Sequence, residues 1–513
     1  MKNTIKATAI VMMTALSLIS CRKENDTLHN FSTADLLTWN KATDSFGEKF
    51  KALWEGLNSN YAIWDYEKEH GLDWDAVYDE FYPKFVELDT LALDEQINDE
   101  TLTKLLKQVV DPLHDGHMAV SMKNHSSGGT VVVCPSDDRN NKEREKELAT
   151  LKNWSPSLAY YIESGKVKDI KMVDVSARTQ IHSVLDSLSK WSNRTLETLS
   201  GRTVVTEDEL DRQIAASRIL ADVSSIKKLS ETEAIVNALN STVLKYDYLQ
   251  IPGVHMIDAK LINDDIIITS ALLEGNIAYL YFNNFSLTPY LTSFPKDEYL
   301  QPYAKELSKD VLDAWYLWFN AIQDLHKSNQ LGGVIIDVRG NGGGKMSDFQ
   351  FVIGALVPSG GLHIMNTRFK RGVGRYDYSP IMPYICATLG IGHVTVTEPI
   401  VVLANAKSVS MSEITTISTK VIDNAKFIGT TTWGGLCGLL SNEAYSYTYA
   451  GHIGVEGVTP VYVYCPSVAT LDINGNVLEG KGVTPDIEIA LEKSSNGADN
   501  QLDRAIEYII SGK

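Results

Sequence analysis

Cysteine, long apolar runs and positive charge are all scarce in this sequence. Five cysteines occur among 513 residues, and their spacing matches no zinc-binding pattern. The apolar run near the N-terminus, residues 7–19, is shorter than the ~20 residues needed to cross a bilayer. Lysine and arginine number 47 against 65 acidic residues, which gives a net charge of −18. This balance argues against nucleic-acid binding, because that requires a basic face.

The N-terminal run has the features of a signal peptide. Lys2 and Lys6 precede it, and it ends in the tetrapeptide L-I-S-C, which resembles the lipobox of bacterial lipoproteins. The resemblance implies that Cys21 is lipidated, and several acyl chains at roughly 0.8 kcal/mol per buried methylene would hold the protein on a membrane. We therefore expect residues 1–20 to be removed and residues 21–35 to be a polar tether. The protein is then an outer-membrane lipoprotein that faces the periplasm or the cell surface.

The second half of the chain contains a buried strand that runs into a glycine-rich loop. Residues 332–338 are a short apolar, β-branched run of the kind that forms a buried strand, and residues 340–344 are glycine except for Asn341. Because glycine costs backbone entropy, such a loop is expected to supply positive φ angles or to let a ligand approach the main chain. Its N–H groups can point at a developing oxyanion, and its spacing matches neither nucleotide-binding glycine motif.

Ser410 follows a second apolar run, residues 399–404, and precedes a helical pattern over residues 414–421. A serine at a sharp strand-to-helix turn presents its hydroxyl to a ligand, while the unpaired N–H groups of the first helical turn point the same way. The same letters also match a capping box, in which Ser410 caps the helix and Glu413 reaches back. Alone, the segment leaves both a nucleophile and an ordinary helix start open.

Taken together, these segments resemble the tail-specific (C-terminal processing) and tricorn-core serine peptidase family. The motifs that carry the resemblance are G-N-I-A-Y-L at 275–280, D-V-R-G-N-G-G-G at 337–344, V-S-M-S-E at 409–413, G-T-T-T-W-G-G at 429–435 and G-V-T-P-D-I at 482–487. The resemblance implies an α/β fold with a crotonase-like catalytic core. It also implies a serine peptidase that acts on peptides or proteins without a cofactor, with Ser410 as the nucleophile.

Two ways of activating the serine exist in that family, and the sequence distinguishes between them. The Ser/Lys branch places its lysine directly after the G-x-x-T-x-G motif, where this chain has Gly435. The tricorn-like branch has Trp-Gly-Gly there, as in residues 433–435, and takes a histidine from an L-x-D-x-H segment, which matches residues 113–117. Because serine needs a base whose pKa lies near the working pH, His117 is the expected general base. Two other nearby basic residues are expected to face solvent: Lys345 and Lys407.

The resemblance assigns further residues to the site. Glu479 is the first choice to orient His117, ahead of Glu456 and the local alternative Asp115. The expected oxyanion hole is formed by N–H groups of Gly342, Gly343 and Met411. The expected substrate cleft is lined by Thr432, Trp433 and Gly434.

Three alternatives remain open from the residues themselves. His114, Asp115 and His117 have the spacing of a partial metal site, but no further ligand is obvious, so no metal is expected. A peptide- or glycan-binding lipoprotein on a peptidase scaffold would keep the cleft without turnover. The four cysteines other than Cys21 can form up to two disulfides or remain buried free thiols.

The rest of the chain divides around these motifs. Residues 36–125 are expected to form a helical N-terminal domain that carries the base, with Asp73 as a helix cap. Residues 126–265 lack a convincing carboxylate-binding loop of a PDZ module and contain charged, helix-favouring runs, so a divergent PDZ-like module, a helical insertion and a lid all stay open. Residues 266–513 are expected to form the catalytic core, and Arg375 lies in a variable segment that could hold a peptide carboxylate.

Overall fold

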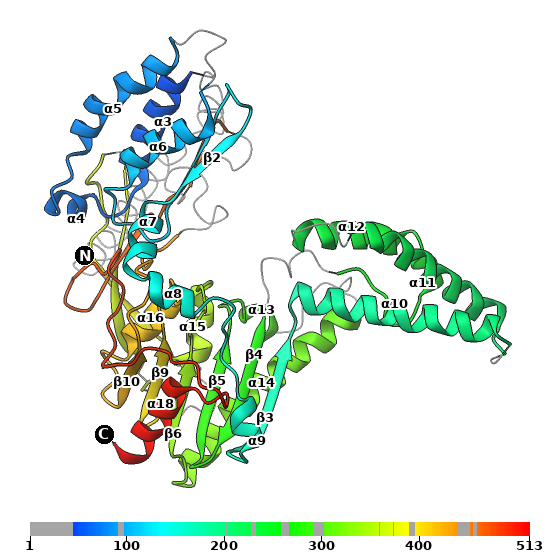
Figure 1. The fold of residues 1–513 in the computed structure, drawn as a ribbon. Coiled ribbons are helices and arrows are strands. Elements are labelled where there is room, and N and C mark those ends of the chain that lie inside the picture. The colour runs from blue at the N-terminus through cyan, green and yellow to red at the C-terminus, as the bar shows by residue number, and fades with distance from the viewer. Residues whose placement is uncertain are drawn as a thin grey trace, which may run out of the picture.

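The computed structural model describes residues 45–90, 97–201, 204–226, 232–257, 266–291, 302–358, 360–372, 374–388, 395–439, 452–454 and 459–512. These residues form a mixed α/β structure with three sheets (Figure 1). The expected signal peptide, Cys21, the tether and Glu456 lie outside them. Within the described part of the chain, no helix combines the length and apolar character needed to cross a membrane.

The largest sheet has seven strands in the order β14-β10-β9-β6-β5-β4-β3. Their bounds are β3 (Val167–Asp174), β4 (Ile267–Leu273), β5 (Ile277–Phe282), β6 (Gly333–Asp337), β9 (Ile400–Ala404), β10 (Ala425–Gly429) and β14 (Ile487–Glu488). The strands from β14 to β5 run parallel, and β4 and β3 are antiparallel. Every residue of β5, β6 and β9 is buried, as is typical of parallel strands covered on both faces. The predicted strands at 332–338 and 399–404 are confirmed.

Helices cover both faces of this sheet (Figure 1). The helices that contribute to the core on one face are α13 (Thr288–Leu291), α14 (Pro302–Lys327), α15 (Met346–Val352) and α16 (Met411–Ser418). On the other face lie α9 (Ala159–Glu163) and α18 (Asn500–Ser511). Successive residues of a strand alternate between the two cores: Ile336 belongs to the same apolar core as Trp318 of α14, whereas Ile335 belongs to the core that contains Leu502 of α18.

The N-terminal helices pack on a second sheet. They are α3 (Phe46–Asn60), α4 (Trp64–Glu69), α5 (Trp74–Leu88) and α6 (Asp99–Val110). The sheet is antiparallel in the order β11-β12-β1-β2, with β1 (Ala119–Lys123), β2 (Thr130–Val133), β11 (His452–Ile453) and β12 (Val461–Tyr464). Asp73 accepts hydrogen bonds from the N–H groups of Asp75 and Ala76, which confirms the predicted cap. Because β12 pairs with β1, segments far apart in sequence meet here.

The segment after β2 begins with two short helices, α7 (Pro135–Glu143) and α8 (Glu145–Thr150). Beyond β3, an arm of helices extends away from the seven-stranded sheet: α10 (Ala177–Leu199), α11 (Glu207–Ile226), α12 (Thr232–Leu244) and the 3-10 turn η1 (Asp247–Leu249) (Figure 1). The arm has its own apolar core, which includes Leu188, Ala216 and Leu239. In the region for which the sequence left a PDZ-like module, a helical insertion and a lid open, the described residues 177–201, 204–226 and 232–244 are mainly helical.

A third sheet connects the core to the N-terminal helices. It has the order β13-β7-β8, with β7 (Leu362–Phe369), β8 (Met382–Cys386) and β13 (Val468–Leu471). Arg368 of β7 pairs with Asp65 at 2.6 Å, and Arg375 pairs with Asp75 at 2.6 Å and donates to Asn58. Arg375 therefore holds two parts of the chain together, and the carboxylate that it binds in the structure is that of Asp75. The cysteines in the described residues are free thiols: Cys134, Cys386, Cys437 and Cys465.

Candidate active site

Ser410 lies at the turn between β9 and α16, at the carboxyl edge of the parallel strands. Its φ of 58° and ψ of −117° are sparsely populated by non-glycine residues and costly to hold. The preceding turn is fixed by the hydroxyl of Ser408, which donates to the carbonyl of Val338 at 2.7 Å. Ser410 itself keeps partial exposure. A strained, accessible serine at a strand-to-helix turn is the geometry that a nucleophile requires.

The glycine-rich loop follows β6 and packs directly against this turn, because β6 and β9 are neighbouring parallel strands. Gly343 has a φ of 96°, and a β-carbon placed on it would lie 2.5 Å from the Ser410 β-carbon and 3.0 Å from the Met411 nitrogen. Only glycine fits this close approach. The Gly343 N–H donates to Asn341 Oδ1 at 2.8 Å, whereas Gly342 is exposed. The predicted loop, serine and Met411 are thus brought together, with the Gly343 donor engaged inside the loop.

Glu413 does more than complete a helix start. Its Oε2 accepts from the Ser410 N–H at 3.0 Å, as a capping box requires. The same carboxylate, fully buried, also accepts from the Thr432 hydroxyl at 2.6 Å and from the N–H groups of Gly434 and Gly435 at 2.7 and 2.8 Å. The Trp-Gly-Gly loop is therefore attached to the serine turn through one side chain.

The segment that carries His117 packs against the same loop. The indole N–H of Trp433 donates to the Gly116 carbonyl at 3.1 Å, and a β-carbon on Gly116 would lie 2.3 Å from the Gly434 carbonyl oxygen. On its other side, the loop accepts a hydrogen bond from the Ser410 N–H at the Gly435 carbonyl, at 2.9 Å. Ser410 and the residue next to His117 are therefore both in contact with residues 433–435.

The environment of His117 favours a neutral imidazole. Burial lowers its pKa to about 4, and a hydrogen bond to the backbone of Cys437 opposes this shift. Its Nδ1 is buried without a partner in the described structure. The residue as a whole is only partly exposed. A neutral imidazole is the protonation state that a general base needs.

Glu479 and Asp115 are both buried beside the histidine segment, and both bind its backbone. Glu479 Oε1 accepts from the Gly116 N–H at 2.7 Å, and Oε2 accepts from the N–H groups of Leu436 and Cys437 at 2.6 and 2.5 Å. Asp115 Oδ1 accepts from the His117 and Met118 N–H groups at 2.8 and 2.6 Å, while Oδ2 is buried without a partner. Burial raises the pKa of Asp115 to about 7 and that of Glu479 well above its usual range. Both therefore position the histidine segment through its main chain.

Other nearby basic groups have different partners. Lys345 is exposed, as expected, but Lys407 is not simply solvent-facing, because its ammonium donates to the Leu151 carbonyl at 2.7 Å. The His114 Nδ1 lies 2.7 Å from a Glu67 carboxylate oxygen. Among the residues that the structure describes, no group of three or more histidine, cysteine or acidic side chains is arranged to hold a metal ion.

Comparison with known proteins identifies the family to which the second half of the chain is similar. Residues 276–489 match the model of Peptidase family S41. The chain contains a peptidase family S41 domain. It is 27% identical over 172 residues to a carboxy-terminal-processing protease of Bartonella bacilliformis and 28% identical over 196 residues to tricorn protease homolog 1 of Streptomyces coelicolor. These alignments cover 33% and 38% of this chain, but 34% and 16% of the two relatives.

Solved structures also align with this chain, among them one that covers most of its length. A crystal structure of a candidate peptidase from Parabacteroides merdae aligns over 91% of this chain and 98% of that chain, with a TM-score of 0.45 and 16% identity. The S41 match contains Ser410, the glycine loop and Glu479, whereas His117 precedes it. The resemblance inferred from the motifs is confirmed.

Two of the three residues expected to line a substrate cleft are instead bound to another side chain of the S41 domain. Thr432 and Gly434 are buried and bound to Glu413, whereas Trp433 keeps partial exposure. The segment of α7 and the residue after it also contact this loop: Asn140 of α7 donates to the Trp433 carbonyl at 3.1 Å, and Arg144, between α7 and α8, donates to the Thr432 carbonyl. Sequence reasoning missed these two residues, because nothing local in a polar, charged helix marks it as a partner of a distant loop.

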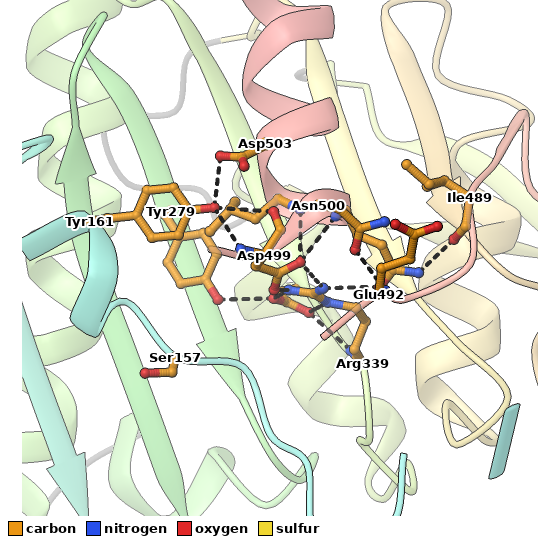
Figure 2. Close-up of polar contacts among 12 residues, drawn as sticks. Ser157, Tyr161, Tyr279, Arg339, Ile489, Glu492, Asp499, Asn500 and Asp503 are labelled. Atoms are coloured by element: carbon orange, nitrogen blue, oxygen red, sulfur yellow. Dashed lines mark hydrogen bonds and ion pairs between the residues drawn. The ribbon is translucent and has the colours of Figure 1, made fainter. Parts of the chain in front are cut away.

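Arg339 directly precedes the glycine loop of the S41 domain and holds its first end through buried ion pairs. Its side chain is fully buried and pairs with Asp337 at 2.6 Å and Asp499 at 2.8 Å. Figure 2 shows Arg339 and Asp499 beside α18, with Tyr161 donating to Asp503. Tyr279 donates to Asp337 in the same network. Because Arg339 directly precedes the loop, these contacts fix the point from which the loop leaves the sheet.

Proposed function

We propose that this protein is a serine peptidase that hydrolyses peptide bonds through an acyl-enzyme on Ser410. The observation that carries the proposal is the packing of three elements: a strained serine turn, a glycine loop within van der Waals distance of it, and a histidine segment attached to the same Trp-Gly-Gly loop. The S41 match supports the same reaction class.

In the proposed mechanism, the Ser410 hydroxyl attacks the carbonyl carbon of a peptide. His117 accepts the hydroxyl proton and then delivers it to the leaving amine, after which water attacks the acyl-enzyme by the same route. The oxyanion is stabilised by the N–H of Met411, the first residue of α16, together with the exposed Gly342 of the glycine loop. Glu479 holds the histidine segment through Gly116.

We also propose the finer assignments that follow from the motifs. The core is crotonase-like, and the helical N-terminal region delivers the base to it. The protein is anchored at Cys21 as an outer-membrane lipoprotein, and its substrates are peptides or proteins in the cell envelope. Its reaction needs no cofactor.

Covalent labelling tests the proposed function. We expect a fluorophosphonate probe to label the wild-type protein at Ser410 and to leave Ser410→Ala unlabelled, because phosphonylation requires the activated hydroxyl. Peptide mapping of the labelled protein identifies the site, and circular dichroism shows whether the variant is folded. Labelling that persists in folded Ser410→Ala would disprove the assignment. A wild-type protein that takes up no probe and cleaves no peptide would favour a peptide- or glycan-binding function.

The pH dependence of cleavage reports on His117. We expect the acid limb of kcat/KM to lie near pH 4, well below the pH of about 6.5 that an unperturbed histidine gives, because burial lowers the pKa of His117 and only the neutral imidazole can accept the serine proton. Activity should therefore rise as the pH rises through this value. Initial rates between pH 3.5 and 8 measure it, and return to pH 7 controls for acid unfolding. A reversible limb at or above pH 6.5 would contradict a buried, neutral base.

A further inference from the structure

Four consecutive backbone N–H groups of one loop donate hydrogen bonds to two buried carboxylates, two to each. Glu413 binds those of Gly434 and Gly435, and Glu479 binds those of Leu436 and Cys437. All four hydrogen bonds are between 2.5 and 2.8 Å long. Residues 434–437 are therefore held along their whole length by two acidic side chains that come from different parts of the chain.

Each carboxylate also binds one element of the proposed reaction. Glu413 accepts from the N–H of Ser410, the nucleophile, at 3.0 Å. Glu479 accepts from the N–H of Gly116, the residue before His117, at 2.7 Å. The loop and its two carboxylates thus form a continuous connection between the serine turn and the histidine segment, which are about 290 positions apart in the sequence.

The contacts of Glu413 exceed what a helix start requires. A capping box needs only the reach back to the Ser410 N–H, which an exposed glutamate also makes. Glu413 is instead fully buried, and burial raises its pKa, while four hydrogen-bond donors oppose that shift. All four partners donate, so the ionised carboxylate is the form that satisfies them all. A buried charge is costly, and this one is compensated only where the loop and the serine turn meet.

We propose that Glu413 is a positioning residue of the peptidase reaction, which sets the Ser410 turn at a fixed distance from the His117 segment by binding the nucleophile's N–H and the 434–435 main chain together. The inference rests on the proposed function. The bond that Glu413 makes to Ser410 goes to the main-chain N–H and not to the reacting hydroxyl. Glu479 performs the equivalent task at the other end of the loop, where it binds Gly116.

The test compares Glu413→Gln with the wild type in peptide cleavage and in fluorophosphonate labelling. Glutamine keeps the shape but places an amide NH₂ against backbone donors, so the loop should shift. We expect kcat to fall about 10- to 100-fold with KM changed by less than about threefold, because misplacing reacting groups by about 1 Å costs on this order. The labelling rate of Ser410 should fall in parallel, since it depends on the same activation. Wild-type kcat in folded Glu413→Gln would overturn the inference.

Two further variants separate positioning from general destabilisation. Asp486→Asn removes another carboxylate of the S41 domain that accepts a backbone N–H, that of Phe427 at 2.7 Å, and it should lower stability without changing kcat. If Glu413→Gln does not fold, Thr432→Val removes one of the four bonds to Glu413, and we expect kcat to fall about three- to tenfold at unchanged KM. Unchanged kcat in folded Thr432→Val would then overturn the inference. If the wild-type protein itself showed no labelling at Ser410, the proposed function would be overturned instead.

Discussion

Replacing Ser410 by alanine, His117 by alanine, or both together is expected to lower kcat by similar factors, on the order of 10⁴–10⁶. A nucleophile and its base act as a unit, so removing either one removes covalent catalysis, and removing the second costs little more. The structure supports this expectation because both segments contact residues 433–435, with the Ser410 N–H bound at Gly435 and the Gly116 carbonyl bound by Trp433. Cleavage of a fluorescence-quenched peptide by the three variants measures the effect.

The shape of this mutant cycle distinguishes a Ser/His unit from its alternatives. If the double variant were slower than either single variant by the product of their effects, Ser410 and His117 would act independently, and another group would be the base. Lys407→Met is a suitable control, because its ammonium is bound to the Leu151 carbonyl and is expected to take no part. A loss of 10³ or more in folded Lys407→Met would contradict His117 as the base. Circular dichroism on every variant excludes misfolding as the cause.

The parts of the fold that follow local rules could be predicted from the sequence. The apolar, β-branched runs before Asn341 and Ser410 form fully buried neighbouring strands, and Asp73 caps a helix as its position indicates. The glycines after β6 were expected to permit a close approach, and Gly343 lies against the Ser410 β-carbon. These features depend on periodicity, residue shape and backbone conformation, all of which are local.

The parts of the site that depend on long-range contacts could not be predicted in the same way. A capping box accounts for a glutamate at position 413, so the sequence gives no sign that its carboxylate also binds Thr432 and Gly434. Glu479 was expected to orient the imidazole, but the structure places its carboxylate on the main chain of Gly116, 363 positions away, and of residues 436–437. Arginine, with five donors, can pair with many acids, and only packing decides which one it meets. Periodicity carries no information on such pairings.

Replacing Arg339 by methionine is expected to destabilise the S41 domain by about 3–5 kcal/mol. The guanidinium contacts the Asp337 and Asp499 carboxylates and the Gln501 side chain, all of them buried. Methionine fills much of the volume but leaves the two carboxylates unpaired in the interior, which costs far more than the loss of an exposed ion pair. Chemical denaturation, followed by a probe in the S41 domain, measures the shift. Lys420→Met breaks a partly exposed pair with Asp486 and should cost less than about 1 kcal/mol.

A compensated variant shows whether the unpaired charges or the lost packing cause this effect. Adding Asp337→Asn and Asp499→Asn to Arg339→Met removes the buried charges, so we expect the triple variant to regain part of the lost stability, whereas a packing defect would leave it as unstable as Arg339→Met alone. Burying an ion network is at best a weak source of stability compared with an apolar core. Its position directly before the glycine loop suggests what the network contributes instead: it holds the end of β6 in one orientation, so that the loop meets the Ser410 turn. Arg339→Met is therefore also expected to lower kcat. Recovered stability without recovered kcat in the triple variant would support that division of roles, and full recovery of both would contradict it.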